Sequence, residues 1–153
     1  MKRRKFLQSS VAGGALVVAA GSGLLKPSIA AAERSNETAF AATEADEAVK
    51  TLFGGMQAED SGDITIKAPK QAENGAVVPI KVETSLAADT IAIVAEKNPF
   101  PLTTAVHLNG AKGFYSTRIK MGQTSNVVAY VKSGDKLYKA SQTIKVTVGG
   151  CGG

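Results

Sequence analysis

The sequence predicts a mainly β protein: an antiparallel β-sandwich of about seven strands, with a helix before it and a glycine-rich arm after it. From residue 62 onward, hydrophobic residues recur with a period of two, as they do when alternate side chains of a strand face a core. Turn-forming pairs such as Asn74-Gly75 and Asn98-Pro99 separate the alternating segments. These connections are too short for the helical crossovers of a parallel sheet, so we expect an immunoglobulin-like sandwich.

The first 32 residues have the features of an export signal. A basic start (MKRRK) precedes an apolar run of 17 residues and small-residue cleavage sites, of which the simplest follows Ala32. The pair Arg3-Arg4, followed by Phe6-Leu7, resembles a twin-arginine signal, which carries folded proteins to the periplasm. An apolar run of this length is short for a transmembrane helix, so we expect residues 1–32 to be cleaved and the mature protein to have no stable membrane association.

The excess of positive charge belongs to this leader. The chain has a formal net charge of +5, but five of its 18 basic residues lie in residues 1–32, which contain no acid. The 13 that remain equal the 13 acidic residues. Because the mature chain lacks the basic surplus that phosphate backbones attract, nucleic acid is not an expected partner.

Residues 33–60 form an N-terminal helical segment, in which one helix is predicted over residues 36–53. Its apolar stripe consists of Ala41, Ala45, Val49 and Leu52. Asn36 is a suitable N-cap, and Gly54-Gly55 ends the helix. The stripe is thin, so this helix needs a surface on which to lie.

Residues 61–148 form the sandwich domain. Its strands are predicted near residues 63–68, 77–85, 90–96, 102–108, 113–120, 126–132 and 137–148. The domain contains no Trp and no second Cys, so we expect a sandwich without the inter-sheet disulfide and buried Trp of antibody domains.

The last strand leads directly into the arm, residues 149–153. Ile144, Val146 and Val148 alternate with polar residues up to Gly149. The arm reads Gly149-Gly150-Cys151-Gly152-Gly153 and carries the only cysteine of the chain. Fully extended, it holds the Cys151 thiol about 10 Å beyond the edge of the sheet.

A lone thiol in this position indicates a carrier arm. A thiolate is a strong nucleophile, and an odd cysteine in an exported protein points to a reactive or intermolecular thiol. Glycines have no Cβ and let a thin chain enter a narrow channel. The sequence predicts a carrier whose bound group other proteins process, with no catalytic residue and no cofactor of its own. Two alternatives stay open: a structural or chaperone-like module joined to a partner by a disulfide at Cys151, and a thiol enzyme that turns over alone.

Other candidate sites are weaker. His107 is the only histidine, so a cupredoxin-like copper site is not expected, and a Cys151–His107 pair is left open. Met56 and Met121 are interpreted as core or interface fillers. The acids Glu44, Asp46 and Glu47 are interpreted as a solvated helix face, which leaves no metal site.

Two further pairs of residues leave their roles open. Arg118 and Lys120 alternate on a predicted strand; they suit an anion such as a sulfonate, although solvated strand positions are preferred. Tyr130 and Tyr138 are candidates for a partner interface.

The C-terminal sequence resembles the SoxY family, the sulfur-carrier subunits of the thiosulfate-oxidising Sox system. The resemblance rests on the terminal GGCGG, the preceding STRIKMGQTSNVVAYVKSGDKLYKASQTIKVTV, and the segments AENGAVVPIKV and EKNPFPL. The terminal pentapeptide is the most specific of these, and the twin-arginine leader agrees with them.

The resemblance implies the chemistry that the thiol alone does not specify. It implies an immunoglobulin-like fold, a heterodimer with a SoxZ-like subunit, and Cys151 as the attachment point of sulfur substrates. A c-type cytochrome complex would join thiosulfate oxidatively to the thiol as a cysteine S-thiosulfonate. A hydrolase would then release sulfate and leave a cysteine persulfide.

Overall fold

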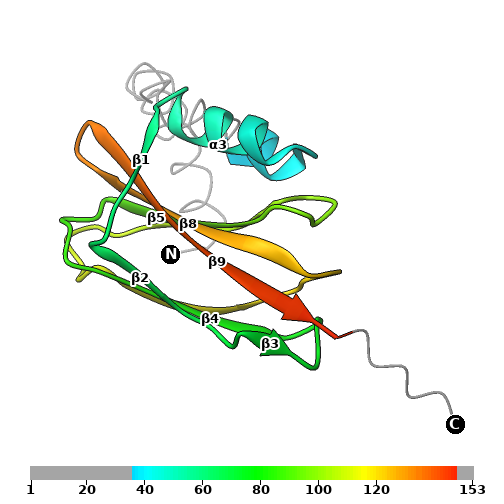
Figure 1. Ribbon diagram of the computed structural model, residues 1–153. Helices are drawn as coiled ribbons and strands as arrows, with labels where there is room; N and C mark the ends of the chain where they lie inside the picture. The colour runs from blue at the N-terminus through cyan, green and yellow to red at the C-terminus, as the bar shows by residue number, and fades with distance from the viewer. Residues whose placement is uncertain (1–35, 148–153) are drawn as a thin grey trace, which may run out of the picture. The chain divides into compact units, whose positions relative to one another are not determined.

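The computed structural model describes residues 36–147, which form three layers: a helical layer, a large sheet and a small sheet (Figure 1). The elements are α3 (Ala45–Phe53), β1 (Ala58–Asp60), β2 (Ile64–Lys67), β3 (Gln71–Ala72), β4 (Val78–Thr84), β5 (Thr90–Ala95), β6 (Leu102–His107), β7 (Phe114–Ile119), β8 (Ser125–Ser133) and β9 (Lys136–Val146). Among residues 36–147, no helix has both the length and the apolar character that crossing a membrane requires.

The strands form the two sheets of an immunoglobulin-like sandwich, as predicted. The large sheet has the order β1-β9-β8-β5-β6, with β3 also paired to β9, and the small sheet has the order β2-β4-β7. All seven predicted strands are present, and all pairings among them are antiparallel. The Thr104 hydroxyl and the Tyr115 hydroxyl, 2.9 Å apart, join the two sheets at the side formed by β6 and β7.

The main core lies between the sheets and follows the period-two pattern. On β5, Ile91 and Ile93 face the small sheet, while Ala92 and Val94 face the helical layer. Every residue of β5 is buried because it is the one long strand covered on both faces. The remaining side chains between the sheets are Ile64, Ala72, Val78, Ile80, Val82, Ala88, Ala95, Ile119, Met121, Val127, Ala129, Val131 and Ile144.

The helical layer covers the outer face of the large sheet, but it is two helices and not the one predicted. Residues 36–41 are helical, residues 42–44 are not, and α3 then begins after Glu44, whose backbone is extended. Both segments contribute to one core cluster: Ala39 before the break, and Val49 and Phe53 after it. A straight helix over residues 36–53 would be about 27 Å long, and a twisted sheet turns away beneath such a length. The break lets both segments stay on the sheet. Gly54 (φ 65°) and Gly55 (φ 80°) end α3, as predicted.

Two short strands were missed by the sequence analysis, and both pair in parallel with β9. β1 pairs with Leu137–Lys139 and β3 with Lys145–Val146. They are two or three residues long, and β1 is polar, so neither shows a hydrophobic period. Together they cover the outer edge of β9, which would otherwise be the exposed edge of the large sheet.

The proposed leader (residues 1–32) and arm (residues 149–153) lie outside the described residues. The predicted sandwich boundary at residue 148 also falls there.

Candidate functional site: the root of the C-terminal arm

The last described residue, Thr147, is the point from which the arm begins. Cys151 follows it by four residues, so the Cys151 Cα lies at most about 14 Å from the Thr147 Cα. The site that the structure describes is therefore the root of the arm, the C-terminal end of β9 and its surroundings. Figure 1 shows β3 beside this end of β9.

Hydrogen bonds hold the root from both sides. On the β3 side, the Lys145 N–H donates to the Lys70 carbonyl at 3.0 Å. The Thr147 N–H and hydroxyl both donate to the Ala72 carbonyl, at 3.1 and 3.2 Å. On the other side, the Val146 N–H donates to the Thr124 hydroxyl oxygen at 3.0 Å. The backbone is therefore fixed up to Thr147, which limits free movement of the arm to the residues after it.

Gly75 allows a third segment to pack against the root. The Met121 N–H donates to the Gly75 carbonyl at 2.7 Å. A Cβ at position 75 would lie 2.4 Å from the Met121 carbonyl oxygen and 2.9 Å from Cγ1 of Val146. Only glycine fits this approach without a shift of backbone. The sequence marked Asn74-Gly75 as a turn but gave no sign of this contact, because the contact partners are distant in the chain.

His107 lies at the opposite end of the sheet, and the geometry excludes it as a base for Cys151. His107 ends β6 and lies in register with Thr90, Lys132 and, on β9, Leu137. The ten residues from Leu137 to Thr147 span about 30 Å along the strand. This exceeds the reach of the arm. The His107 Nδ1 is instead 2.9 Å from the Thr90 hydroxyl.

Arg118 and Lys120 occupy solvated strand positions, as preferred. Both side chains are exposed, and Arg118 lies opposite Pro79 on β4. The one ion pair among residues 36–147 joins Lys67 and Glu83, 2.6 Å apart. Neither cation therefore forms part of a built anion site in the described chain.

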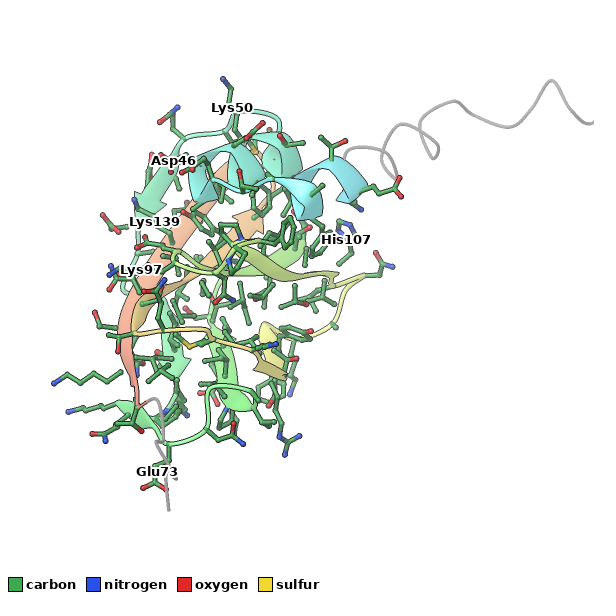
Figure 2. The ribbon with its side chains drawn as sticks, turned by 90° about the vertical axis from the view of Figure 1, so that its right-hand side faces the viewer. Asp46, Lys50, Glu73, Lys97, His107 and Lys139 are labelled. Atoms are coloured by element: carbon green, nitrogen blue, oxygen red, sulfur yellow. The ribbon has the colours of Figure 1, made fainter. Side chains whose placement is uncertain are left out.

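The other candidates are placed in the body of the fold. Met121 is buried in the main core, and Met56 packs against the cluster beneath the helices. Glu44, Asp46 and Glu47 are exposed, and residues 36–147 hold no group of acidic, His or Cys side chains suited to a metal. Figure 2 shows Asp46 on the helical layer, pointing outward.

The two tyrosines lie in different layers. Tyr130 lies beneath α3, with its ring centroid 6.3 Å from that of Phe53, while Tyr138 packs against the main core. Burial raises the pKa of Tyr130 above its ordinary value, and the carboxylates of Asp46, Glu96 and Asp60 raise it further. Neither side chain is freely exposed in the described chain.

Fold and site together define a class of protein: a small β-sandwich whose last strand, clamped on both sides, leads into a terminal thiol arm. The family model described as sulfur oxidation protein SoxY matches residues 49–151, a segment that ends at Cys151. The chain belongs to the SoxY family.

A solved structure agrees with this assignment. The chain is 38% identical to the sulfur carrier protein SoxY from Chlorobium limicola f thiosulfatophilum, with a TM-score of 0.63. The alignment covers 72% of this chain and 97% of that one. No curated protein matches the chain at a significant level.

Proposed function

We propose that this protein is a periplasmic covalent carrier in thiosulfate oxidation, which holds sulfur intermediates on Cys151 for partner enzymes. The observation that carries the proposal is the match to the SoxY family, which extends to Cys151 itself. The fixed root supports it, because a carrier must present its thiol from a defined point while the thiol enters other active sites.

The chemistry follows the family and balances at the thiol. In the loading step, the Cys151 thiolate and thiosulfate form an S–S bond and yield the S-thiosulfonate. The two electrons released pass to a c-type cytochrome complex. In the next step, water attacks the terminal sulfonate sulfur. Sulfate and two protons leave, and the persulfide anion remains on Cys151.

Catalysis in these steps belongs to the partners. An accessible thiol has an unperturbed pKa of about 8.5, so only a few per cent is thiolate at neutral pH unless a base or cation activates it. His107, the only histidine, lies about 30 Å away along the sheet, beyond the reach of the arm. Activation of Cys151 is therefore assigned to the enzyme that receives it.

The assembly and location that accompany this role are a heterodimer with a SoxZ-like subunit and export by the twin-arginine pathway. Cys151 has no partner cysteine in its own chain, so it stays available for substrate in an oxidising compartment.

The test is the intact mass of the protein after incubation with thiosulfate and the oxidising cytochrome complex. A thiosulfonate adduct on the C-terminal peptide is expected for the wild type and is absent from Cys151→Ser, which should unfold at the same temperature. The alternative function, a module tethered by a disulfide, predicts a partner disulfide at Cys151 as the sole adduct. Turnover of thiosulfate by the isolated protein would instead indicate a thiol enzyme.

Substitution of Gly149 and Gly150 by Val tests the arm separately from the thiol. Valine is β-branched and stiff, and it thickens a chain that must enter partner sites. We expect alkylation of Cys151 by a small reagent to keep its rate while turnover with the partner enzymes falls. Equal loss of both rates would show that the glycines act on the chemistry of the thiol.

A further inference from the structure

Three loops meet at the end of the sandwich from which the arm begins. They are residues 73–77 before β4, residues 96–101 between β5 and β6, and residues 120–124 before β8. The register places them there: Ala95, at the end of β5, is level with Val127 on β8 and Gln142 on β9, close to the root. We call these three loops the arm-end surface. Figure 2 shows Glu73, in one of them, pointing away from the body.

Hydrogen bonds fix the arm-end surface to itself and to the root. Asn98 uses both ends of its side chain: its Nδ2 donates to the Lys120 carbonyl at 2.7 Å, and its Oδ1 accepts from the Gly122 N–H at 3.2 Å. Gln123 Nε2 donates to the Lys97 carbonyl at 3.2 Å. The same loop, through Thr124, holds Val146 at the root. The surface and the origin of the arm therefore form one rigid unit.

This fixed surface presents exposed apolar side chains. Phe100 is 57% exposed and is the most exposed large hydrophobic residue among residues 36–147; Val77, on the neighbouring loop, is 50% exposed. Phe100 lies between Pro99 and Pro101, whose φ angles are restricted. The Pro101 carbonyl also accepts the Ala95 N–H at 2.8 Å, which closes the loop. An aromatic side chain held out to solvent on a stiffened loop loses little entropy on binding, which is the property of an interface anchor.

The length of the arm determines which molecule meets this surface. The Cys151 Cα reaches at most about 14 Å from the Thr147 Cα. An enzyme that takes Cys151 into an active site below its own surface must therefore bring the rim of that site against the arm-end surface. Contact there is a geometric consequence of the short arm and does not depend on a particular chemistry.

We propose that Phe100 is a docking anchor for the enzymes that act on Cys151, and that it fits an apolar pocket beside the entrance of their active sites. The proposal rests on the proposed function and adds the surface through which the carrier is recognised. Pro99 and Val77 extend the apolar contact on either side of the anchor. The thiol and the anchor are then read together, so that a free thiol of another protein is a poor substrate.

Phe100→Ala tests the proposal, and Phe114→Ala is its matched control. Phe114 is 49% exposed, but it starts β7 opposite Glu83, at the far end of the sandwich. Both variants are prepared as full chains with the SoxZ-like subunit, loaded as the S-thiosulfonate, and given to the sulfate-releasing hydrolase. Loss of an anchor costs about tenfold in binding. We therefore expect KM for the Phe100→Ala carrier to rise about tenfold, with kcat nearly unchanged and the Phe114→Ala carrier equal to wild type.

Three further measurements distinguish this outcome from others. Alkylation of Cys151 by iodoacetamide should proceed equally in all three proteins, because the thiol is untouched. Equal KM for Phe100→Ala and wild type would overturn the proposal. A weakened complex with the SoxZ-like subunit, measured by sedimentation, would also overturn it by assigning Phe100 to the subunit interface. Absence of any thiosulfonate on the wild type would instead contradict the proposed function, which the mass measurement tests alone.

Discussion

Replacement of Gly75 by Ala should destabilise the root of the arm although it adds only one methyl group. The new Cβ would lie 2.4 Å from the Met121 carbonyl oxygen, a separation that real Cβ atoms do not show, so backbone must shift. Overpacking of this kind costs about 1–3 kcal/mol, and loss of the 2.7 Å hydrogen bond between the Met121 N–H and the Gly75 carbonyl adds about 1 kcal/mol. We expect a total of about 2–3 kcal/mol, or a fall in Tm of roughly 10 °C for a domain of this size.

Gly62→Ala is the control for this experiment. A Cβ at Gly62 meets nothing within 4 Å. Because alanine restricts the unfolded chain, the substitution should be neutral or stabilise the fold by up to about 1 kcal/mol. Urea unfolding followed by circular dichroism gives both free energies of unfolding. If the two variants differ by less than about 0.5 kcal/mol, the close approach at Gly75 does not constrain the root, and our account of its packing is incorrect.

Three other substitutions give distinct readouts. Ile144→Ala removes a fully buried side chain from the strand that carries the arm and should cost about 2–5 kcal/mol in urea unfolding, more than any substitution of the exposed Lys145 beside it. Since the pKa of Tyr130 is raised above the ordinary 10.0, its neutral phenol stabilises the fold below pH 10, and this contribution is lost as the pH rises through the folded-state pKa; thermal melts of Tyr130→Phe should show a weaker loss of stability in alkali than those of wild type. Arg3-Arg4→Lys-Lys should leave the precursor in the cytoplasm in cell fractionation, and an unchanged periplasmic yield would contradict export by the twin-arginine pathway.

The long elements of the fold could be predicted because their signals are local. The period-two pattern from Ile64 to Val146 corresponds to strands that bury one face, and Gly54-Gly55 ends α3 through its own backbone preference. The break at residues 42–44 could not be predicted, because the helical stripe continues through it and the sheet beneath is what turns. β1 and β3 are strands only because the edge of β9 is there to pair with them.

The site divides in the same way. Cys151 and its glycines were recognisable because the tail contains nothing else, and the family match includes the thiol. The surroundings were not recognisable, since Ala72, Thr124 and Gly75 come to the root from three separate segments. The NPFP segment was noted as a resemblance, but its place next to the arm depends on the hydrogen bonds of Asn98 to residues more than 20 positions away.

The parallel pairing of β3 with the end of β9 also determines how the protein responds to tension. When a partner enzyme holds Cys151 and the two molecules begin to separate, the pull acts along β9. The strand is bonded sideways to β8 over most of its length, to β3 at its end and to β1 at its start. A force along the strand therefore loads these bonds together, in shear, and cannot open them one after another as peeling would. Withdrawal of the arm should thus break the contact with the enzyme before it disturbs the carrier.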